Sequence, residues 1–429
     1  MKRLLTVAFA LFFAHSALAG VKIEHWVSPS GARVYFVESR GLPILDVQVD
    51  FAAGSMFDPE GKSGLAALTR ATLDNGAGKL DETAIAEQLA DIGAALGGSA
   101  DTDRASVALR TLAAKDKREP ALAILKAVLQ QPLFDAAIFE REKTRTIAAL
   151  KEAMTRPDSI GGKAFWAAMY PQHPYGRQAT PESVAALNRD DLAAFHARYY
   201  NAANASITLV GDLSRQDAEK IAESITAGLP KGAPATLPAA PELAAGNTIA
   251  LAHPASQAHV FIGLPAIERG NPDFFPLLVG NYTLGGGGFV SRLMKEVRDQ
   301  RGYAYSVYSY FAPMRQTGPF QIGLQTKRSQ ARDAIKVARD VLAGFLKDGP
   351  SDEELAAAKA NLTGSFPLRL DSNKKILENV ANIGFYGLPL DYLDQYQARV
   401  RAVTVDEIKA AFARRVVPEK LITVTVAAD

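Results

Sequence analysis

The spacing of apolar positions along the chain predicts a mixture of strands and helices. Leu45, Val47, Val49 and Phe51 occupy every second position, which indicates a strand with one buried face. Helical spacing appears near 64–73, 82–92, 118–130, 135–154, 183–198, 272–284, 289–300, 330–347, 352–364, 372–386 and 404–415, and further strand patterns near 107–109, 258–264, 303–312, 318–326 and 421–427. Because several strands are neighbours in sequence, we expect an α+β fold with mainly antiparallel sheets and helices packed on one face.

The chain also repeats itself at a constant offset. The segment 190–198 resembles 406–414, and the segment 135–143 resembles 351–359, both at an offset of 216 residues. Each member of the first pair is followed by a β-rich run, and these runs match at an offset of 215 residues. Such a repeat predicts a duplication and therefore two homologous domains.

Proline content suggests where the two domains are joined. Pro230, Pro234, Pro238 and Pro241 fall in the segment 228–246 and prevent a regular helix or a central strand there. We expect an extended linker over 228–246. The predicted domains are then residues 20–227 and residues 247–429.

The N-terminus has the pattern of a signal peptide over residues 1–19. Lys2 and Arg3 precede an apolar run over 4–14, and Ala17-Leu18-Ala19 gives a small-x-small cleavage site before Gly20. An N-terminal membrane anchor is the alternative interpretation. The chain contains no cysteine, so it uses neither disulfides nor thiolate ligands. We expect a periplasmic protein that does not contact the membrane after cleavage.

Charge argues against a nucleic-acid partner. The full chain has 48 basic and 46 acidic residues. Both basic residues of the segment 1–19 leave with it, so the remaining chain is neutral. Nucleic-acid binding normally requires a basic face.

The most distinctive stretch runs from Leu284 to Phe311 and combines glycines, arginines and tyrosines. Its four glycines, 285–288, are followed by neither G-K-[S/T] nor the G-x-G-x-x-G spacing, so a phosphate-binding loop is excluded. We interpret them as a flexible turn before a helix that Gly302 ends. Tyr303, Tyr305 and Val307 then alternate as in a strand. Composition alone favours a surface salt bridge for Arg298 and core packing for Tyr305.

A family resemblance changes this interpretation. The segment 53–71, a strand end, a turn and a helix start, resembles the pitrilysin (insulinase) family of zinc peptidases, which includes the mitochondrial processing peptidases. In that family the helix carries H-x-x-E-H, two histidine ligands and a general base. Here the motif would fall on Ala67, Leu68, Thr69, Arg70 and Ala71. The third ligand, a glutamate, would fall near Ala149, with Glu142 and Glu152 on either side.

No other histidines replace this motif. His25, His173, His196, His253 and His259 include no pair at i,i+4 spacing. We therefore expect this chain to bind no catalytic zinc.

Two further segments resemble the family. The segment 97–109 is similar to the strand that pairs with substrate in active members, although Ser99-Ala100 stands where Asn-Ala is usual. H-P-Y-G-R (173–177) is a typical family turn, which we interpret as structural.

The family's second element is retained. Its members carry an Arg and a Tyr seven residues apart in the C-terminal half, and Arg298 and Tyr305 match that spacing and the glycine between them. In the family this pair contacts the substrate near the scissile carbonyl. The resemblance implies half of a clamshell whose homologous partner chain carries H-x-x-E-H and the zinc, and Arg298 and Tyr305 would bind peptide and stabilise the oxyanion. This chain alone would be inactive.

Two alternatives remain open at this stage. The chain could be an inert scaffold or binding protein of the same fold, in which Arg298 and Tyr305 are dispensable. A homodimer acting with another metal is disfavoured by the histidine positions.

Overall fold

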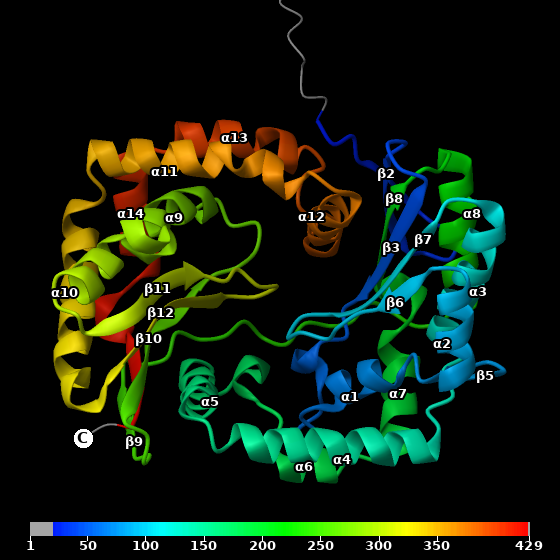
Figure 1. The fold of residues 1–429 in the computed structure, drawn as a ribbon, viewed down its shortest axis with the longest axis horizontal. Helices are drawn as coiled ribbons and strands as arrows, with labels where there is room; N and C mark the ends of the chain where they lie inside the picture. Colours follow the sequence, from blue (N-terminus) through cyan, green and yellow to red (C-terminus); the bar gives the residue numbers. More distant parts are fainter. Residues whose placement is uncertain (1–19, 428–429) are drawn as a thin grey trace, which may run out of the picture.

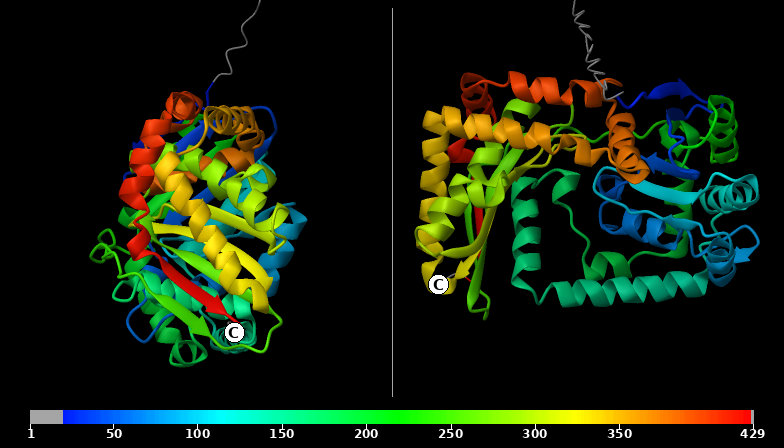
Figure 2. Two further views of the ribbon diagram at one scale, coloured as in Figure 1. Left: turned by 90° about the vertical axis from the view of Figure 1, so that its left-hand side faces the viewer. Right: turned by 45° about the horizontal axis from the view of Figure 1, so that its top comes forward.

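The computed structural model describes residues 20–427, which form two lobes side by side (Figure 1). The predicted signal peptide, residues 1–19, lies outside the described residues. Among the described residues, no helix is long and apolar enough to cross a membrane. Each lobe contains one sheet with helices against it, as the two further views also show (Figure 2).

The N-terminal lobe is built on a six-stranded sheet with the order β1-β2-β8-β3-β7-β6. Strands β2 and β8 are parallel, and every other neighbouring pair is antiparallel. The strands are β1 (Glu24–Val27), β2 (Arg33–Glu38), β3 (Ile44–Phe51), β6 (Ala95–Gly97), β7 (Ala105–Leu112) and β8 (Ala205–Gly211). A separate two-stranded ribbon consists of β4 (Gly76–Ala77) and β5 (Leu80–Asp81).

The C-terminal lobe repeats this sheet without the first strand. Its order, β9-β13-β10-β12-β11, corresponds position by position to β2-β8-β3-β7-β6. The parallel pair is again at the same place, between β13 and β9. The strands are β9 (Thr248–Leu251), β10 (Gln257–Ile267), β11 (Ala304–Phe311), β12 (Gly318–Lys327) and β13 (Ile422–Val426). The α+β fold with two homologous, mainly antiparallel sheets is confirmed.

Four pairs of helices begin 216 residues apart, at the offset found in the sequence. The first-lobe members are α3 (Lys115–Gln130), α4 (Ala136–Ala153), α5 (Pro157–Met169) and α7 (Arg189–Tyr199). Their counterparts are α10 (Ala331–Asp348), α11 (Asp352–Gly364), α12 (Asn373–Tyr386) and α14 (Val405–Arg415). The repeat in the sequence therefore reflects a repeat of the structure.

The remaining helices differ in part from the sequence predictions. They are α1 (Leu65–Thr72), α2 (Glu82–Asp91), α6 (Pro181–Ala185), α8 (Arg215–Thr226), α9 (Phe274–Asn281) and α13 (Tyr392–Ala402). The single helix predicted over 183–198 is two helices, because Asn188 caps α7 by accepting a hydrogen bond from the Asp191 N–H. The helices α5, α8 and α13 were not predicted.

The two lobes exchange one helix each. Helix α5 of the N-terminal half packs on β10 and β13 of the other lobe, and α12 of the C-terminal half packs on β3 and β8 (Figure 1). Both contacts use a helical glycine. A Cβ atom on Gly161 would lie 2.5 Å from the Phe261 ring, and one on Gly384 would lie 2.6 Å from the Tyr35 ring. Each sheet thus completes its core with a helix from the other half.

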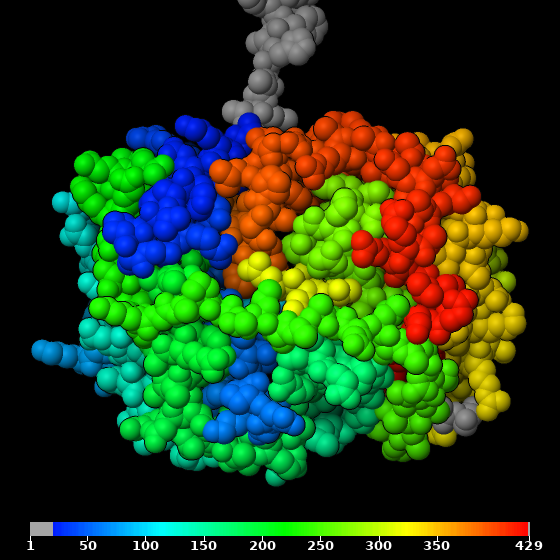
Figure 3. Space-filling model, turned by 180° about the vertical axis from the view of Figure 1, so that it is seen from behind, coloured from blue at the N-terminus to red at the C-terminus, as the bar shows by residue number. Residues whose placement is uncertain are grey.

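The predicted linker segment runs along the outside of the molecule. Residues 230–247 form neither helix nor strand, and the green segment crosses the back in Figure 3. The segment is tied to both halves, since the Asn204 side chain accepts a hydrogen bond from the Ala235 N–H at 3.0 Å and the Gln316 side chain donates to the Pro238 carbonyl at 2.5 Å. The chain is extended here but held in place.

Candidate functional site

The segment that carries Arg298 forms an irregular helix. Residues Met294–Asp299 form a π-helical turn that buries Met294 and Val297. Gly302 ends it with a positive φ of 63°, and the Gly302 N–H donates to the Arg298 carbonyl at 2.8 Å. This confirms the helix end predicted at Gly302, and the chain reverses from there into β11.

The glycines before this helix are not a flexible turn. Gly285 and Gly286 belong to a π-helical turn over Tyr282–Gly286, and Gly288–Val290 form a 3₁₀ turn. A Cβ atom on Gly285 would lie 2.4 Å from Ser309 Oγ and 2.6 Å from the Ser309 backbone nitrogen. Glycine is required here because the turn lies directly against β11, so the interpretation as a flexible turn is wrong.

Tyr305 is turned out of the sheet by an irregularity in its strand. Ala304 pairs with Thr326 and Val307 with Leu324, so β11 contains one more residue than β12 over this interval. Such a bulge redirects side chains next to functional sites. Ala304 and Val307 are buried, whereas Tyr305 is 88% exposed. Tyr305 therefore does not pack in the core, and the simple alternation predicted for residues 303–307 is also wrong.

Arg298 and Tyr305 lie together on this surface. The Arg298 guanidinium carbon is 5.6 Å from the centre of the Tyr305 ring and 4.8 Å from that of Phe289. Its neighbour Asp299 is 3.5 Å away, and within the described residues Arg298 makes no other ion pair. Cation–π contacts of this kind hold a guanidinium in place without using its N–H donors. The donors of Arg298 and the hydroxyl of Tyr305 thus remain available to a ligand.

A cavity of about 330 Å³ adjoins the pair, and both polar and apolar groups line it. Its walls include Gln257, Arg298, Gly302, Tyr305, Ser306, Gln325 and Lys327. Phe289 and Val290 are 70% and 72% exposed. The surface therefore combines hydrogen-bond donors with nearby apolar side chains, which suits an extended peptide better than a small polar ion.

Arg70 occupies the helix position at which the zinc motif would have its general base. Arg70 is buried in α1, and its Nε donates to the Ser106 carbonyl of β7 at 2.7 Å. Its other nitrogens hydrogen-bond the Asp74 carboxylate at 3.2 and 3.4 Å. The two ligand positions, Ala67 and Ala71, carry only methyl groups. A fixed guanidinium repels a cation, so these residues do not fit zinc.

The flanking carboxylates do not supply a replacement. Glu142 pairs with Arg141 at 2.9 Å and with Arg145 at 3.8 Å, and Glu152 pairs with Arg156 at 4.0 Å. Over residues 20–427, no group of three His, Asp or Glu side chains is arranged to hold a metal ion.

His25, His173, His196 and His253 make structural contacts. His25 Nδ1 lies 2.8 Å from the Val34 carbonyl, and His196 Nε2 lies 2.9 Å from the Leu129 carbonyl. Burial lowers the pKa of His196 and of His173, which favours their neutral forms.

The role of the turn at 173–177 had no signal in the sequence. His173 Nε2 lies 2.5 Å from the Gln316 side chain, and the Tyr175 hydroxyl donates to the buried Asp103 at 2.6 Å. Asp103 also accepts hydrogen bonds from the Arg315 N–H and the Tyr386 hydroxyl, both in the C-terminal half. Burial, and next the charge of Asp103, raise the pKa of Tyr175 and Tyr386. The turn therefore fastens the two lobes together.

Comparison with known proteins identifies the family of the chain. The family model described as "Insulinase (Peptidase family M16)" matches residues 34–181, and the model "Peptidase M16 inactive domain" matches residues 186–362. A crystal structure of a peptidase M16 inactive domain from Pseudomonas fluorescens superposes with a TM-score of 0.91 at 38% identity, over 94% of this chain and 97% of that one. The chain belongs to the M16 (insulinase) family.

Two further proteins show how much of the chain is matched. The "Non-peptidase homolog YmxG" of Helicobacter pylori is 27% identical, and the match covers 95% of this chain and 94% of that protein. The crystal structure of the periplasmic protease PqqL from Escherichia coli shares the fold at a TM-score of 0.80 and 16% identity, over 95% of this chain but 45% of that one. Together with the residues at 67–71, the descriptions of the C-terminal family model, the Pseudomonas structure and the Helicobacter relative indicate a chain of the inactive M16 type.

Proposed function

We propose that this M16 chain is the non-zinc subunit of a heterodimeric periplasmic metallopeptidase that degrades unfolded peptides. Its homologous partner would carry H-x-x-E-H and hold the zinc. The observation that carries the proposal is the exposed Arg298–Tyr305 pair, with unused donors, on a chain whose own metal position is filled by Arg70.

The chemistry of the pair suits a role in amide hydrolysis. A peptide carbonyl gains negative charge as it becomes tetrahedral, and donors already in place stabilise that charge. The guanidinium of Arg298 offers a planar set of N–H groups, and the hydroxyl of Tyr305 offers one more. Phe289 and Val290 beside them would hold apolar side chains of the peptide. In this role Arg298 and Tyr305 orient the substrate and stabilise the oxyanion.

Export, pairing with a second chain and peptide binding are each supported by a separate observation. The pattern of residues 1–19 favours export, and PqqL, a periplasmic protease by its description, has a chain about twice the length matched here. A chain of that length has room for two units of this fold, which favours a paired assembly for the shorter chain. The edge strand β6 is free to pair with an extended peptide.

The test is a reconstitution. This chain, an H-x-x-E-H homologue from the same organism, and their mixture are each incubated with an unfolded peptide. We expect cleavage in the mixture alone, and a chelator should abolish it. In the mixture, Tyr305→Phe should lower kcat about 10²-fold or more while the heterodimer still forms. An unchanged kcat would remove Tyr305 from catalysis, and cleavage by this chain alone would overturn the proposal.

A second candidate function is an inert scaffold or binding subunit. The description "Non-peptidase homolog" of the Helicobacter relative favours it. In that case the partner would be fully active alone, and the Arg298 and Tyr305 variants would leave its rate unchanged. The same reconstitution therefore separates the two candidates.

A further inference from the structure

A second cavity, unrelated to Arg298 and Tyr305, lies within the C-terminal half. It measures about 210 Å³ and is enclosed by α9, the turn Phe366–Arg369, α12 and α13. We call it the arginine pocket and define it by Arg269, Arg369, Asn382, Tyr392 and Tyr396. A neighbouring hollow of about 280 Å³ shares Arg269 and Tyr392 with it and adds Arg399.

The arginine pocket is strongly cationic. No Asp or Glu lines either of the two hollows. Within the part of the chain that the structure describes, Arg269 and Arg369 form no ion pair, and Arg399 hydrogen-bonds only Gln395 of its own helix. Burial raises the pKa of Tyr392 to about 12, and the charges of all three arginines act against that rise. Three cations therefore act at one place with no carboxylate beside them.

Two residues that line this pocket carry a buried donor that has no acceptor within the described residues. Tyr396 is 4% exposed, and its hydroxyl makes no hydrogen bond within the described residues. The Nε of Arg269 is likewise buried without an acceptor. Each such group costs about 1–3 kcal/mol when it stays unsatisfied, so buried polar groups of native proteins nearly always have partners. An acceptor that reached either group would remove this cost.

Apolar side chains form much of the remaining lining. The Phe366 ring stacks on the Tyr396 ring at 4.4 Å and 11°, and Phe274 and Leu388 form part of the opposite wall. A guanidinium matches a carboxylate by two parallel hydrogen bonds.

We propose that the arginine pocket binds a small organic carboxylate with an apolar, preferably aromatic, body. The carboxylate lies against Arg269 and the Tyr396 hydroxyl, and the body lies between Phe274 and Phe366. A free carboxylic acid and the C-terminal residue of a peptide share this chemistry. The proposal does not depend on the peptidase assignment, because it uses none of the residues of that site.

The binding test compares an acid with its amide. The full mature chain is titrated by calorimetry with N-acetyl-phenylalanine and with N-acetyl-phenylalaninamide. We expect saturable one-site binding of the acid and at least tenfold weaker binding of the amide, which lacks the charge. A hexapeptide ending in phenylalanine, with a free or an amidated C-terminus, tests whether the pocket takes the C-terminal residue of a peptide or only a free carboxylic acid. Equal affinity for acid and amide, or no saturable binding of the acid, would overturn the proposal.

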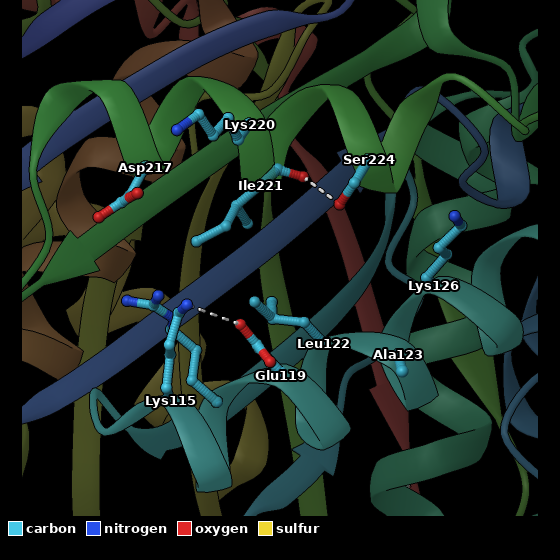
Figure 4. A pocket seen from close by; sticks show the side chains of 10 residues that line it. Lys115, Glu119, Leu122, Ala123, Lys126, Asp217, Lys220, Ile221 and Ser224 are labelled. Atoms are coloured by element: carbon cyan, nitrogen blue, oxygen red, sulfur yellow. Dashed lines mark hydrogen bonds and ion pairs between the residues drawn. The ribbon is translucent and has the colours of Figure 1, made fainter.

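Variants locate the binding. Tyr396→Phe keeps the stacked ring and should weaken the acid about fivefold, and Arg269→Gln should weaken it about tenfold or more. The control is Lys126→Gln, in the groove of about 460 Å³ between α3 and α8, where exposed lysines line the wall (Figure 4). That variant should bind as the wild type does. Thermal unfolding checks that each variant is folded. The proposal fails if Tyr396→Phe and Arg269→Gln both retain wild-type affinity, or if Lys126→Gln weakens binding equally.

Discussion

Arg70 and Arg298 make an instructive pair, because they lie in comparable segments of the two repeated halves. Each lies between two strands that correspond in the two sheets, Arg70 between β3 and β6 and Arg298 between β10 and β11. Arg70 is 4% exposed, and its N–H groups donate to the Ser106 carbonyl and the Asp74 carboxylate. The Arg298 side chain is 31% exposed and rests between two aromatic rings.

The difference shows that neighbours decide what an arginine does. In the N-terminal half a carbonyl and a carboxylate surround the guanidinium, so it holds α1 against β7. In the C-terminal half Gly285 lets its turn lie against β11, and the bulge turns Tyr305 outward beside Arg298. Arg70 thus stabilises the packing of the N-terminal half, whereas Arg298 lies on a surface that a ligand can reach.

The largest expected effect belongs to Arg298. Arg298→Met in the reconstituted heterodimer should lower kcat by about 10²–10³-fold, because a donor to the oxyanion is lost. Its free energy of unfolding should change by less than about 0.5 kcal/mol, since the side chain is largely free of structural contacts. Steady-state kinetics and urea unfolding measure the two quantities. A variant with full activity would reduce Arg298 to a surface residue and remove the contrast with Arg70.

Arg70→Met should give the opposite result. It leaves the Ser106 carbonyl and the Asp74 carboxylate without their partner, which should lower the free energy of unfolding by about 3 kcal/mol. The peptidase rate of the folded heterodimer should stay near that of the wild type. Urea unfolding measures the loss, with Arg298→Met as the matched control. Equal stability of the two variants would contradict the structural role of Arg70.

The glycine run offers a third comparison. Gly285 corresponds to Thr69 of α1 at the repeat offset, but it lies against Ser309 instead of leading into a regular helix. Gly285→Ala should cost about 1–3 kcal/mol of stability through overpacking. Gly344→Ala, in the middle of α10 with nothing within 4 Å of its Cβ position, should instead add about 0.5–1 kcal/mol. Thermal unfolding of the two variants should shift in opposite directions.

The acids before the first helix of each half should respond to pH in opposite ways. Burial raises the pKa of Asp58 to about 6, although it accepts hydrogen bonds from the Gly64 and Ala66 N–H groups. Burial also acts to raise the pKa of Asp273, but hydrogen bonds from Arg414 and Arg415 lower it overall. A raised carboxyl pKa makes stability fall as pH rises from about 4 to 6, and a lowered one makes stability fall as pH drops below about 4.

Asparagine variants, whose side chains do not ionise, test this difference in pH dependence. Relative to the wild type, Asp58→Asn should gain about 1–2 kcal/mol between pH 4 and pH 7. Asp273→Asn should be destabilising at pH 7, and its deficit should shrink as pH falls below about 4. Urea unfolding from pH 3 to pH 8 measures both. Parallel curves for the two variants would contradict the assigned environments.

The sequence predicted those features that depend on local pattern. Helices α3, α4, α11 and α14 carry regular apolar spacing, and the repeat offset predicted two similar sheets. The Arg298–Tyr305 pair followed from spacing and resemblance. Helix α5 was missed because Gly161 and Gly162 interrupt its pattern, and α12 gave no sign that its partner is the distant sheet. The outward turn of Tyr305 depends on pairing with β12, and the arginine pocket on the packing of four separate segments, so neither has a local signal.

The exchanged helices bear on how this molecule can be divided. A fragment ending before residue 228 would keep α5 without the strands it covers, and it would leave β3 and β8 bare where α12 belongs. Such exposed sheet faces promote aggregation. Expression of either half alone should therefore give insoluble material, whereas co-expression of both as separate polypeptides should restore a soluble complex.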